Sequence, residues 1–168
     1  MALSADVPLG AVAAQLNRMM VSNTRSSVFI TAILGRVDAA SGVVEYVNAG
    51  HPAPVLLRRG RAQPEDDGHA LPLGVEADEV YRVQRIEPGG DLDVALFYTD
   101  GLIEAADPAG KLLNLGPVEK TLATVPRHTT DAVLRALLAL VHGHLGTAKN
   151  ADDLTLMVLA YTPAPGTA

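Results

Sequence analysis

The chain has 168 residues, of which 48% are apolar and 19% are charged, and its formal net charge is −6 at pH 7. This composition is typical of a single globular domain and excludes a disordered chain. The acidic balance argues against a nucleic-acid surface, and the absence of cysteine excludes disulfides and zinc bound by thiolates.

Residues 8–22 predict the first helix of the chain. Pro8 lies in the first turn, where a proline costs no helical hydrogen bond. Four apolar side chains recur at the spacing of one helical face: Val12, Leu16, Met19 and Met20. We therefore expect this face to be buried.

The middle of the chain predicts strands. Residues 26–38 are rich in β-branched side chains and predict a central strand, and residues 43–49 alternate and predict its hairpin partner. A third strand is expected over residues 54–58, followed by a stretch that is mostly loop up to residue 80. Residues 81–87 alternate as well, and a Pro-Gly-Gly-Asp turn joins them to the apolar residues 92–98, which predicts a second hairpin.

The C-terminal part predicts helices before a last strand. Pro117 lies where a helix can begin. Residues 129–145 carry apolar side chains on one helical face, and Thr129 or Thr130 can cap this helix. Residues 151–161 predict a strand. This segregation of helices and antiparallel strands along the chain indicates an α+β fold.

Acidic residues mark the ends of two predicted strands. Asp100 follows residues 92–98, and Asp152 and Asp153 precede the apolar part of the last strand. If these strands are antiparallel neighbours, the three carboxylates converge. Carboxylates held close together repel each other and need a cation. Ligation by oxygen alone favours Mg²⁺ or Mn²⁺ over zinc.

Each acidic motif also has a simpler interpretation. Asp-Gly is a common turn, and two aspartates before a strand can form a solvated loop. Gly101 is expected to let the chain turn sharply and to leave room beside an ion. The joint pattern of the two motifs favours a metal site, where a cation could make water nucleophilic and neutralise a phosphoryl group.

Two other polar features favour structural roles. His51 has no partner at a metal-ligand spacing, so we expect it to shape its loop. The basic cluster of Arg58, Arg59 and Arg61 surrounds a glycine, and a solvated hairpin tip is the favoured interpretation.

Four stretches of the chain carry a resemblance to a known family. They are YVNAGHPAPVLL, LPLG, GGDLDVALFYTDGLIEA and NADDLTLMVL. In this order they resemble the catalytic domain of the metal-dependent protein phosphatases of type 2C, specifically the bacterial branch typified by the stage II sporulation protein E. PLGAVAAQLNRMM and VFITAILGRVDAASG are similar to the helix and strand that precede these motifs, so the resemblance extends over residues 8–161.

The resemblance implies an antiparallel β-sandwich flanked by helices, in α-β-β-α layers, with a two-metal Mn²⁺ or Mg²⁺ centre. It implies hydrolysis of phosphoserine or phosphothreonine by metal-activated water, without a covalent phosphoenzyme. The metal-binding aspartates of the family's TDG and DDxT motifs correspond to Asp100 and Asp152, and Asp153 is expected beside them in the same metal site. The implied substrate is a phosphorylated regulatory protein such as an anti-sigma-factor antagonist.

One part of the family pattern is missing. The upstream acidic motifs, which supply the groups that bridge the metal ions, do not occur before residue 27. We therefore expect a domain that is N-terminally truncated relative to the family, with weak or no phosphatase activity by itself. Sheet edges left open by missing strands predict pairing in a homodimer.

The chain is expected to form one phosphatase-like domain over residues 1–162, with a flexible tail over residues 163–168. No apolar run approaches the roughly 18 to 20 residues of a membrane span, which favours a cytoplasmic protein without membrane contact. The alternative to a phosphatase is a catalytically inactive regulatory or protein-binding module with the same fold. Metal binding would separate the two.

Overall fold

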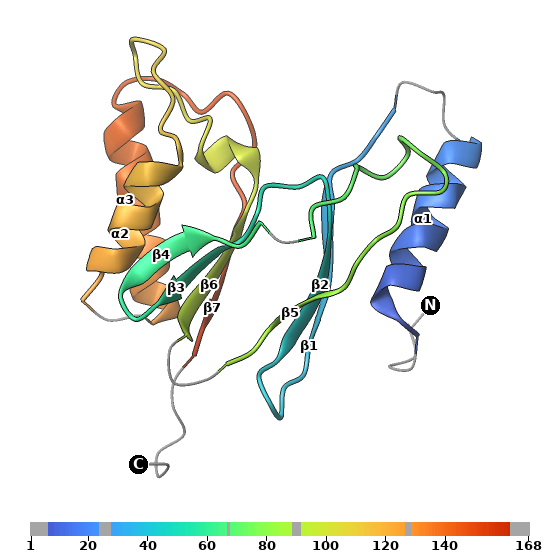
Figure 1. The fold of residues 1–168 in the computed structure, drawn as a ribbon. Helices are drawn as coiled ribbons and strands as arrows, with labels where there is room; N and C mark the ends of the chain where they lie inside the picture. The colour runs from blue at the N-terminus through green and yellow to red at the C-terminus, as the bar shows by residue number, and fades with distance from the viewer. Residues whose placement is uncertain (1–6, 24–27, 67, 89–91, 127–128, 162–168) are drawn as a thin grey trace. The chain divides into compact units, whose positions relative to one another are not determined.

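The computed structural model of the chain forms two compact units, each built from separate stretches of sequence (Figure 1). Residues 1–51 and 66–87 form the first unit, and residues 52–65 and 88–168 form the second. The structure describes residues 7–23, 28–66, 68–88, 92–126 and 129–161. The predicted tail over residues 163–168 therefore lies outside the described residues. Within the described ranges, none of the helices combines the length and apolar character that crossing a membrane requires.

The first unit is a three-stranded antiparallel sheet with one helix packed on it. Its elements are α1 (Leu9–Asn23), β1 (Ala32–Val37), β2 (Val44–Ala49) and β5 (Gln84–Ile86), and the strand order is β1-β2-β5. β1 and β2 form the predicted hairpin, with Leu34 opposite Val47. The core between helix and sheet consists of Leu9, Ala13, Val47, Ala49, Leu73 and Tyr81.

The buried face of α1 is the predicted one only in part, because Met20 packs against the core as expected but two other members of that face do not. The helix buries Leu9, Ala13 and Asn17. Leu16 and Met19 are instead 38% and 54% exposed. The physical reason is close packing, because a Cβ at Gly10 would lie 2.5 Å from the backbone oxygen of Tyr81. The missing side chain of Gly10 allows the helix to approach so closely.

The second unit is a four-stranded antiparallel sheet with two helices on one face (Figure 1). Its strands are β3 (Val55–Arg58), β4 (Arg61–Pro64), β6 (Leu92–Tyr98) and β7 (Leu156–Ala160), in the order β4-β3-β6-β7. Its helices are α2 (Leu115–Thr124) and α3 (Thr130–Leu145). The core includes Val55, Leu57, Val94 and Leu96 from the sheet and Val118, Leu122, Val133 and Leu137 from the helices.

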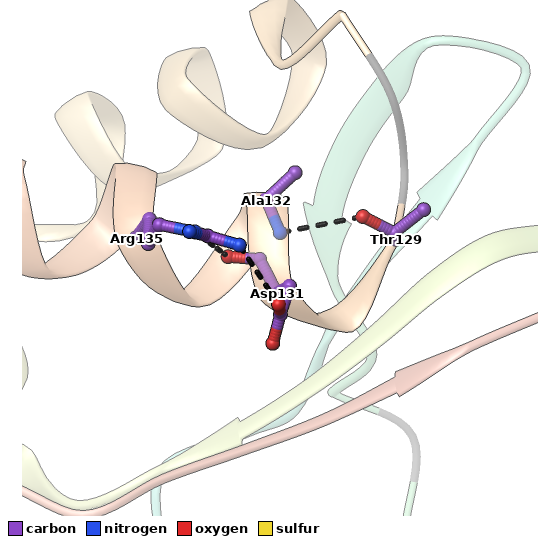
Figure 2. A network of polar contacts seen from close by, with 4 residues as sticks. All are labelled: Thr129, Asp131, Ala132 and Arg135. Atoms are coloured by element: carbon purple, nitrogen blue, oxygen red, sulfur yellow. Dashed lines mark hydrogen bonds and ion pairs between the residues drawn. The ribbon is translucent and has the colours of Figure 1, made fainter.

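The cap of α3 is one of the two predicted threonines. Thr129 accepts a hydrogen bond from the backbone N–H of Ala132 at 3.3 Å (Figure 2). One turn further, Arg135 Nη2 contacts Asp131 Oδ2 at 2.7 Å, again as Figure 2 shows. The helix ends at Gly146, whose φ of 55° suits glycine.

The predicted second hairpin is wrong. β5 pairs with β2, so that Val44 lies opposite Ile86, whereas β6 pairs with β3 and β7 in the other sheet. Apolar alternation shows that a segment is a strand, but it does not select the partner strand. Gly89, Gly90 and Asp91 of the predicted turn lie outside the described residues.

One further expectation about strands is wrong. The sequence predicts a central strand over residues 26–38, yet β1 lies at the edge of its sheet among the described residues, and its second half is exposed. The stretch up to residue 80 is mostly loop in its described part, as predicted, but it begins with the edge strand β4. The turn before it contains Arg59 and Gly60 with φ of 50° and 74°, as hairpin turns require. The α+β class with antiparallel sheets is confirmed.

Candidate metal site

β6 and β7 bring the two acidic motifs to the same end of one sheet. The strands are antiparallel neighbours with Tyr98 opposite Leu156, so the residues after β6 lie beside those before β7 (Figure 1). Asp100 begins a short 3₁₀ helix, Asp100–Leu102. The strand pairing that the predicted metal site requires is therefore present.

Asp100 and Asp152 are exposed to solvent, and one oxygen of each carboxylate accepts a hydrogen bond from the backbone N–H of the next residue. Asp100 Oδ1 accepts a hydrogen bond from the N–H of Gly101 at 3.0 Å, and Asp152 Oδ1 accepts one from the N–H of Asp153 at 2.7 Å. These bonds orient each carboxylate. Within the described ranges, the structure shows no donor to the other oxygen, Oδ2, of Asp100 or Asp152, which leaves both atoms available to a ligand.

Gly101 holds the two motifs in direct backbone contact. A Cβ at this position would lie 2.6 Å from the carbonyl oxygen of Asp153 and 3.5 Å from that of Asp152. The φ of Gly101 is not in the left-handed region, so the backbone conformation alone does not require glycine. The expected room beside an ion is taken up by the opposite backbone, and glycine is needed for this close approach.

Thr99 connects the ends of β6 and β7 through three hydrogen bonds. Its N–H donates to the carbonyl of Thr155 at 3.1 Å, and the N–H of Thr155 donates to Thr99 Oγ1 at 2.9 Å. The same hydroxyl donates to the carbonyl of Asp153 at 2.9 Å. The ladder between the strands therefore continues into the acidic segments.

Asn150 makes a second connection between the same segments. Its Nδ2 donates to the carbonyl of Gly101 at 3.3 Å and to that of Asp152 at 2.9 Å. Neither Asn150 nor Thr99 is predicted from the sequence to belong to the site. The sequence signal that could have indicated them is their position as polar residues next to the acids, within the stretches YTDG and NADDLT.

Tyr98, two residues before Asp100, belongs to the core of the second unit. Its side chain is buried, and burial raises the pKa of its hydroxyl, with a further rise from the nearby carboxylate of Glu119. A tyrosine is already neutral at pH 7, and both effects keep it so.

The residue types at this end of the sheet are ones that a hydrated divalent cation can bind. Mg²⁺ commonly keeps several waters and binds one or two carboxylates, and Asp100 and Asp152 can supply these. Across the described part of the chain, no three or more His, Asp or Glu side chains are grouped so that they could hold a metal ion. The expected convergence of three carboxylates is therefore not seen as a group, and the metal role of Asp100, Asp152 and Asp153 stays a prediction.

His51 lies in the first unit, where hydrogen bonds hold its loop. Asn48, which is buried, accepts from the N–H of His51 at 2.8 Å and donates to its carbonyl at 2.9 Å. The His51 Nδ1 is 3.2 Å from Thr31 Oγ1. This arrangement agrees with the predicted loop-shaping role.

A cavity of about 370 Å³ also lies in the first unit, beside the β1–β2 hairpin. Its lining residues are Arg36, Val37, Asp38, Ser41, Val43, Glu45 and Arg85. Arg36 Nη2 contacts Glu45 Oε2 at 2.6 Å, and Arg85 Nε contacts Glu87 Oε1 at 3.1 Å. Since both arginines are paired with carboxylates, the cavity offers no excess positive charge to an anion.

A family model and several known proteins are similar to this chain. The model described as stage II sporulation protein E (SpoIIE) matches residues 1–162. Protein IcfG of Synechocystis sp. (strain ATCC 27184 / PCC 6803 / Kazusa) is 22% identical over 135 residues, which cover 79% of this chain and 21% of IcfG.

Among solved structures, the RsbU and RsbW domains of Rv1364c from Mycobacterium tuberculosis are 28% identical with a TM-score of 0.67, covering 95% of this chain and 44% of that one. The PP2C phosphatase domain of SpoIIE from Bacillus subtilis, with a fragment of its regulatory domain, is 14% identical with a TM-score of 0.74, and the match covers 92% of this chain and 44% of that one. The SiaA-PP2C domain of Pseudomonas aeruginosa is 18% identical with a TM-score of 0.74, and the match covers 91% of this chain and 61% of that one. The last two show a shared fold. The chain spans less than two thirds of each of these proteins.

Proposed function

Since the chain belongs to the stage II sporulation protein E family, we propose that residues 1–162 form a metal-dependent serine/threonine protein phosphatase domain. The observation that carries this proposal is the pairing of β6 with β7, which sets Asp100 and Asp152 at one end of the sheet. The fold shared with PP2C phosphatase domains supports it.

In this proposal Asp100 and Asp152 would hold Mn²⁺ or Mg²⁺ through their carboxylates, with Asp153 beside them. A bound divalent cation supplies an activated water and neutralises charge on the phosphoryl group. The backbone N–H groups of Gly101 and Asp153 orient the two carboxylates. Solvent exposure of the aspartates leaves the site open to a phosphorylated side chain on another protein.

The substrate that we propose is a phosphorylated regulatory protein of the anti-sigma-factor antagonist kind. The similar Mycobacterium tuberculosis protein, which contains an RsbU and an RsbW domain, supports this substrate class. We also propose a cytoplasmic protein. A homodimer joined through sheet edges is supported by the position of β1 at the edge of its sheet in the described part of the chain.

Phosphate release from a phosphoserine peptide in Mn²⁺ tests the proposed activity. Since the upstream acidic motifs are missing, we expect weak turnover that is stopped by a chelator. Asp100→Asn should reduce it at least about 100-fold, because losing a direct metal ligand costs more activity than losing a residue that only orients a ligand. Asp107→Asn is the matched control, because Asp107 is a half-buried aspartate in a turn of the same unit. Weak turnover with this pattern still supports the proposal. Turnover that is insensitive to Asp100→Asn contradicts it.

One observation favours a second candidate, the catalytically inactive binding module. The described residues do not gather three metal-binding side chains at one place. Calorimetric titration with Mn²⁺ separates the candidates. Binding that disappears in Asp100→Ala supports the phosphatase, and no binding by the wild-type chain supports the module.

A further inference from the structure

We propose that Thr99 and Asn150 are positioning residues that set the distance between Asp100 and Asp152 and thereby the affinity of the site for a divalent cation. This inference rests on the proposed function. The two side chains act through the backbone of the acidic segments, since their hydrogen bonds end on carbonyl and N–H groups of those segments.

Thr99 holds the segments together where the paired strands end. The last pair of the β6–β7 ladder is Tyr98 with Leu156. Beyond it, the Thr99 hydroxyl takes the place of a backbone acceptor for the N–H of Thr155 and also donates to the carbonyl of Asp153. One hydroxyl therefore bonds two backbone groups of the opposite segment, directly before Asp100.

Asn150 makes a second link between the same segments. A primary amide has two N–H donors on one nitrogen, and Asn150 uses them for two carbonyls, those of Gly101 and Asp152. One of these carbonyls follows Asp100 in the chain and the other belongs to Asp152. The planar amide therefore connects the two predicted ligand segments without passing through the β-ladder.

These contacts limit the distance between the segments in both directions. The backbone contact at Gly101 prevents a closer approach, because even a Cβ would lie 2.6 Å from the carbonyl oxygen of Asp153. The hydrogen bonds of Thr99 and Asn150 oppose separation, which the repulsion of the carboxylates favours when no cation is bound. The site is thus organised before a cation arrives, and this reduces the ordering cost of binding.

Calorimetric Mn²⁺ titration of five variants of the full chain tests the inference. Asn150→Ala and Thr99→Val remove the connecting groups, Thr99→Ser keeps the hydroxyl, and Asp100→Ala removes a predicted ligand. Asn23→Ala is the matched control, because it removes an exposed amide that donates to the carbonyl of Met19 in the other unit. We expect Asn150→Ala and Thr99→Val to weaken Mn²⁺ binding by about 10- to 100-fold. Thr99→Ser and the control should bind like the wild-type chain.

Amide hydrogen exchange on the metal-free variants provides a readout that needs no cation. We expect faster exchange over residues 101–104 and 153–155 in Asn150→Ala and Thr99→Val, and no change there in Asn23→Ala. The inference alone fails if the wild-type chain binds Mn²⁺, Asp100→Ala does not, and the Asn150 and Thr99 variants bind normally. It also fails if these variants lose affinity without faster exchange. If the wild-type chain binds no Mn²⁺, the proposed function fails, and the inference fails with it.

Discussion

Gly101 is the residue at which the two acidic motifs touch. Asp-Gly is such a common turn sequence that the glycine invites an explanation by backbone conformation. Its φ lies outside the left-handed region, and the missing Cβ instead allows contact with the backbone of Asp153. One absent methyl group therefore determines how near the aspartates can lie.

Gly101→Ala is expected to destabilise the protein by about 1–3 kcal/mol, because the new Cβ must displace the Asp153 carbonyl from which it would be 2.6 Å away. The free energy of unfolding in urea measures this effect. Gly143→Ala is the control, since nothing lies within 4 Å of a Cβ there and alanine favours a helix interior. We expect the control to stabilise the protein by about 0.5–1 kcal/mol. Equal effects of the two substitutions would contradict this account.

Asn17 is a buried polar residue on the packed face of α1. Its Nδ2 donates to the carbonyl of Glu76 at 2.7 Å, and its Oδ1 accepts from the N–H of Gly74 at 2.8 Å. Gly74 has a φ of 95° and belongs to a segment without a helix or strand. The amide therefore supplies the hydrogen bonds that regular structure would otherwise provide.

Asn17→Leu is expected to cost about 1–3 kcal/mol of unfolding free energy. Leucine has a similar size, so the loss comes mainly from the N–H of half-buried Gly74, which loses its acceptor, whereas the carbonyl of Glu76 keeps the N–H of Glu79 as a donor. Chemical denaturation measures the change. At the exposed end of the same helix, Asn23→Leu should change stability by no more than about 0.5 kcal/mol. A small effect at Asn17 would show that its hydrogen bonds are replaced by water.

Among the elements, α3 has two polar contacts at its N-terminus, and we expect them to differ in their contribution to stability (Figure 2). The Thr129 hydroxyl accepts from an N–H that has no partner within the helix. The Asp131–Arg135 ion pair lies in solvent, with side chains 81% and 77% exposed. Water and salt screen such a pair strongly.

Thr129→Ala is expected to lower the stability by about 1 kcal/mol, since it leaves the Ala132 N–H without its cap. Arg135→Ala should cost no more than about 0.5 kcal/mol. Urea titrations of both variants against the wild-type chain compare the two contributions. A larger loss for Arg135→Ala would contradict this ranking.

At the scale of the whole molecule, the chain has two cores, each made from stretches that are separate in sequence. β6 lies between β3 and β7, and six of its seven residues are buried. β1 lies at the edge of its sheet within the described ranges, and three of its six residues are exposed. The backbone amides of β6 should therefore be better protected from hydrogen exchange than those of β1.

Native-state hydrogen exchange is expected to be slowest in β6 and its neighbour β3, with protection close to that of global unfolding. β1 should exchange faster, because its outer backbone groups face away from β2 and its side chains are partly in solvent. Mass spectrometry of peptides from the exchanged protein resolves these strands. Equal protection of β1 and β6 would contradict the expected order.

The sequence by itself determined which segments are helices and strands where the apolar period was strong, as in α3, β2, β6 and β7. It also named Asp100 and Asp152 as acids at strand ends, because that pattern is local. A local sequence pattern does not specify contacts between distant residues. It therefore left open the partner of β5, the edge strand β4 and the buried face of α1.

Only the tertiary structure decided how near the acidic motifs lie and what holds them there. The pairing of β6 with β7, the missing Cβ of Gly101 and the hydrogen bonds of Thr99 and Asn150 join residues about fifty positions apart. Residue types specify which atoms can bind a cation. Their spacing arises from packing and hydrogen bonds between strands, which exist only once the chain has folded.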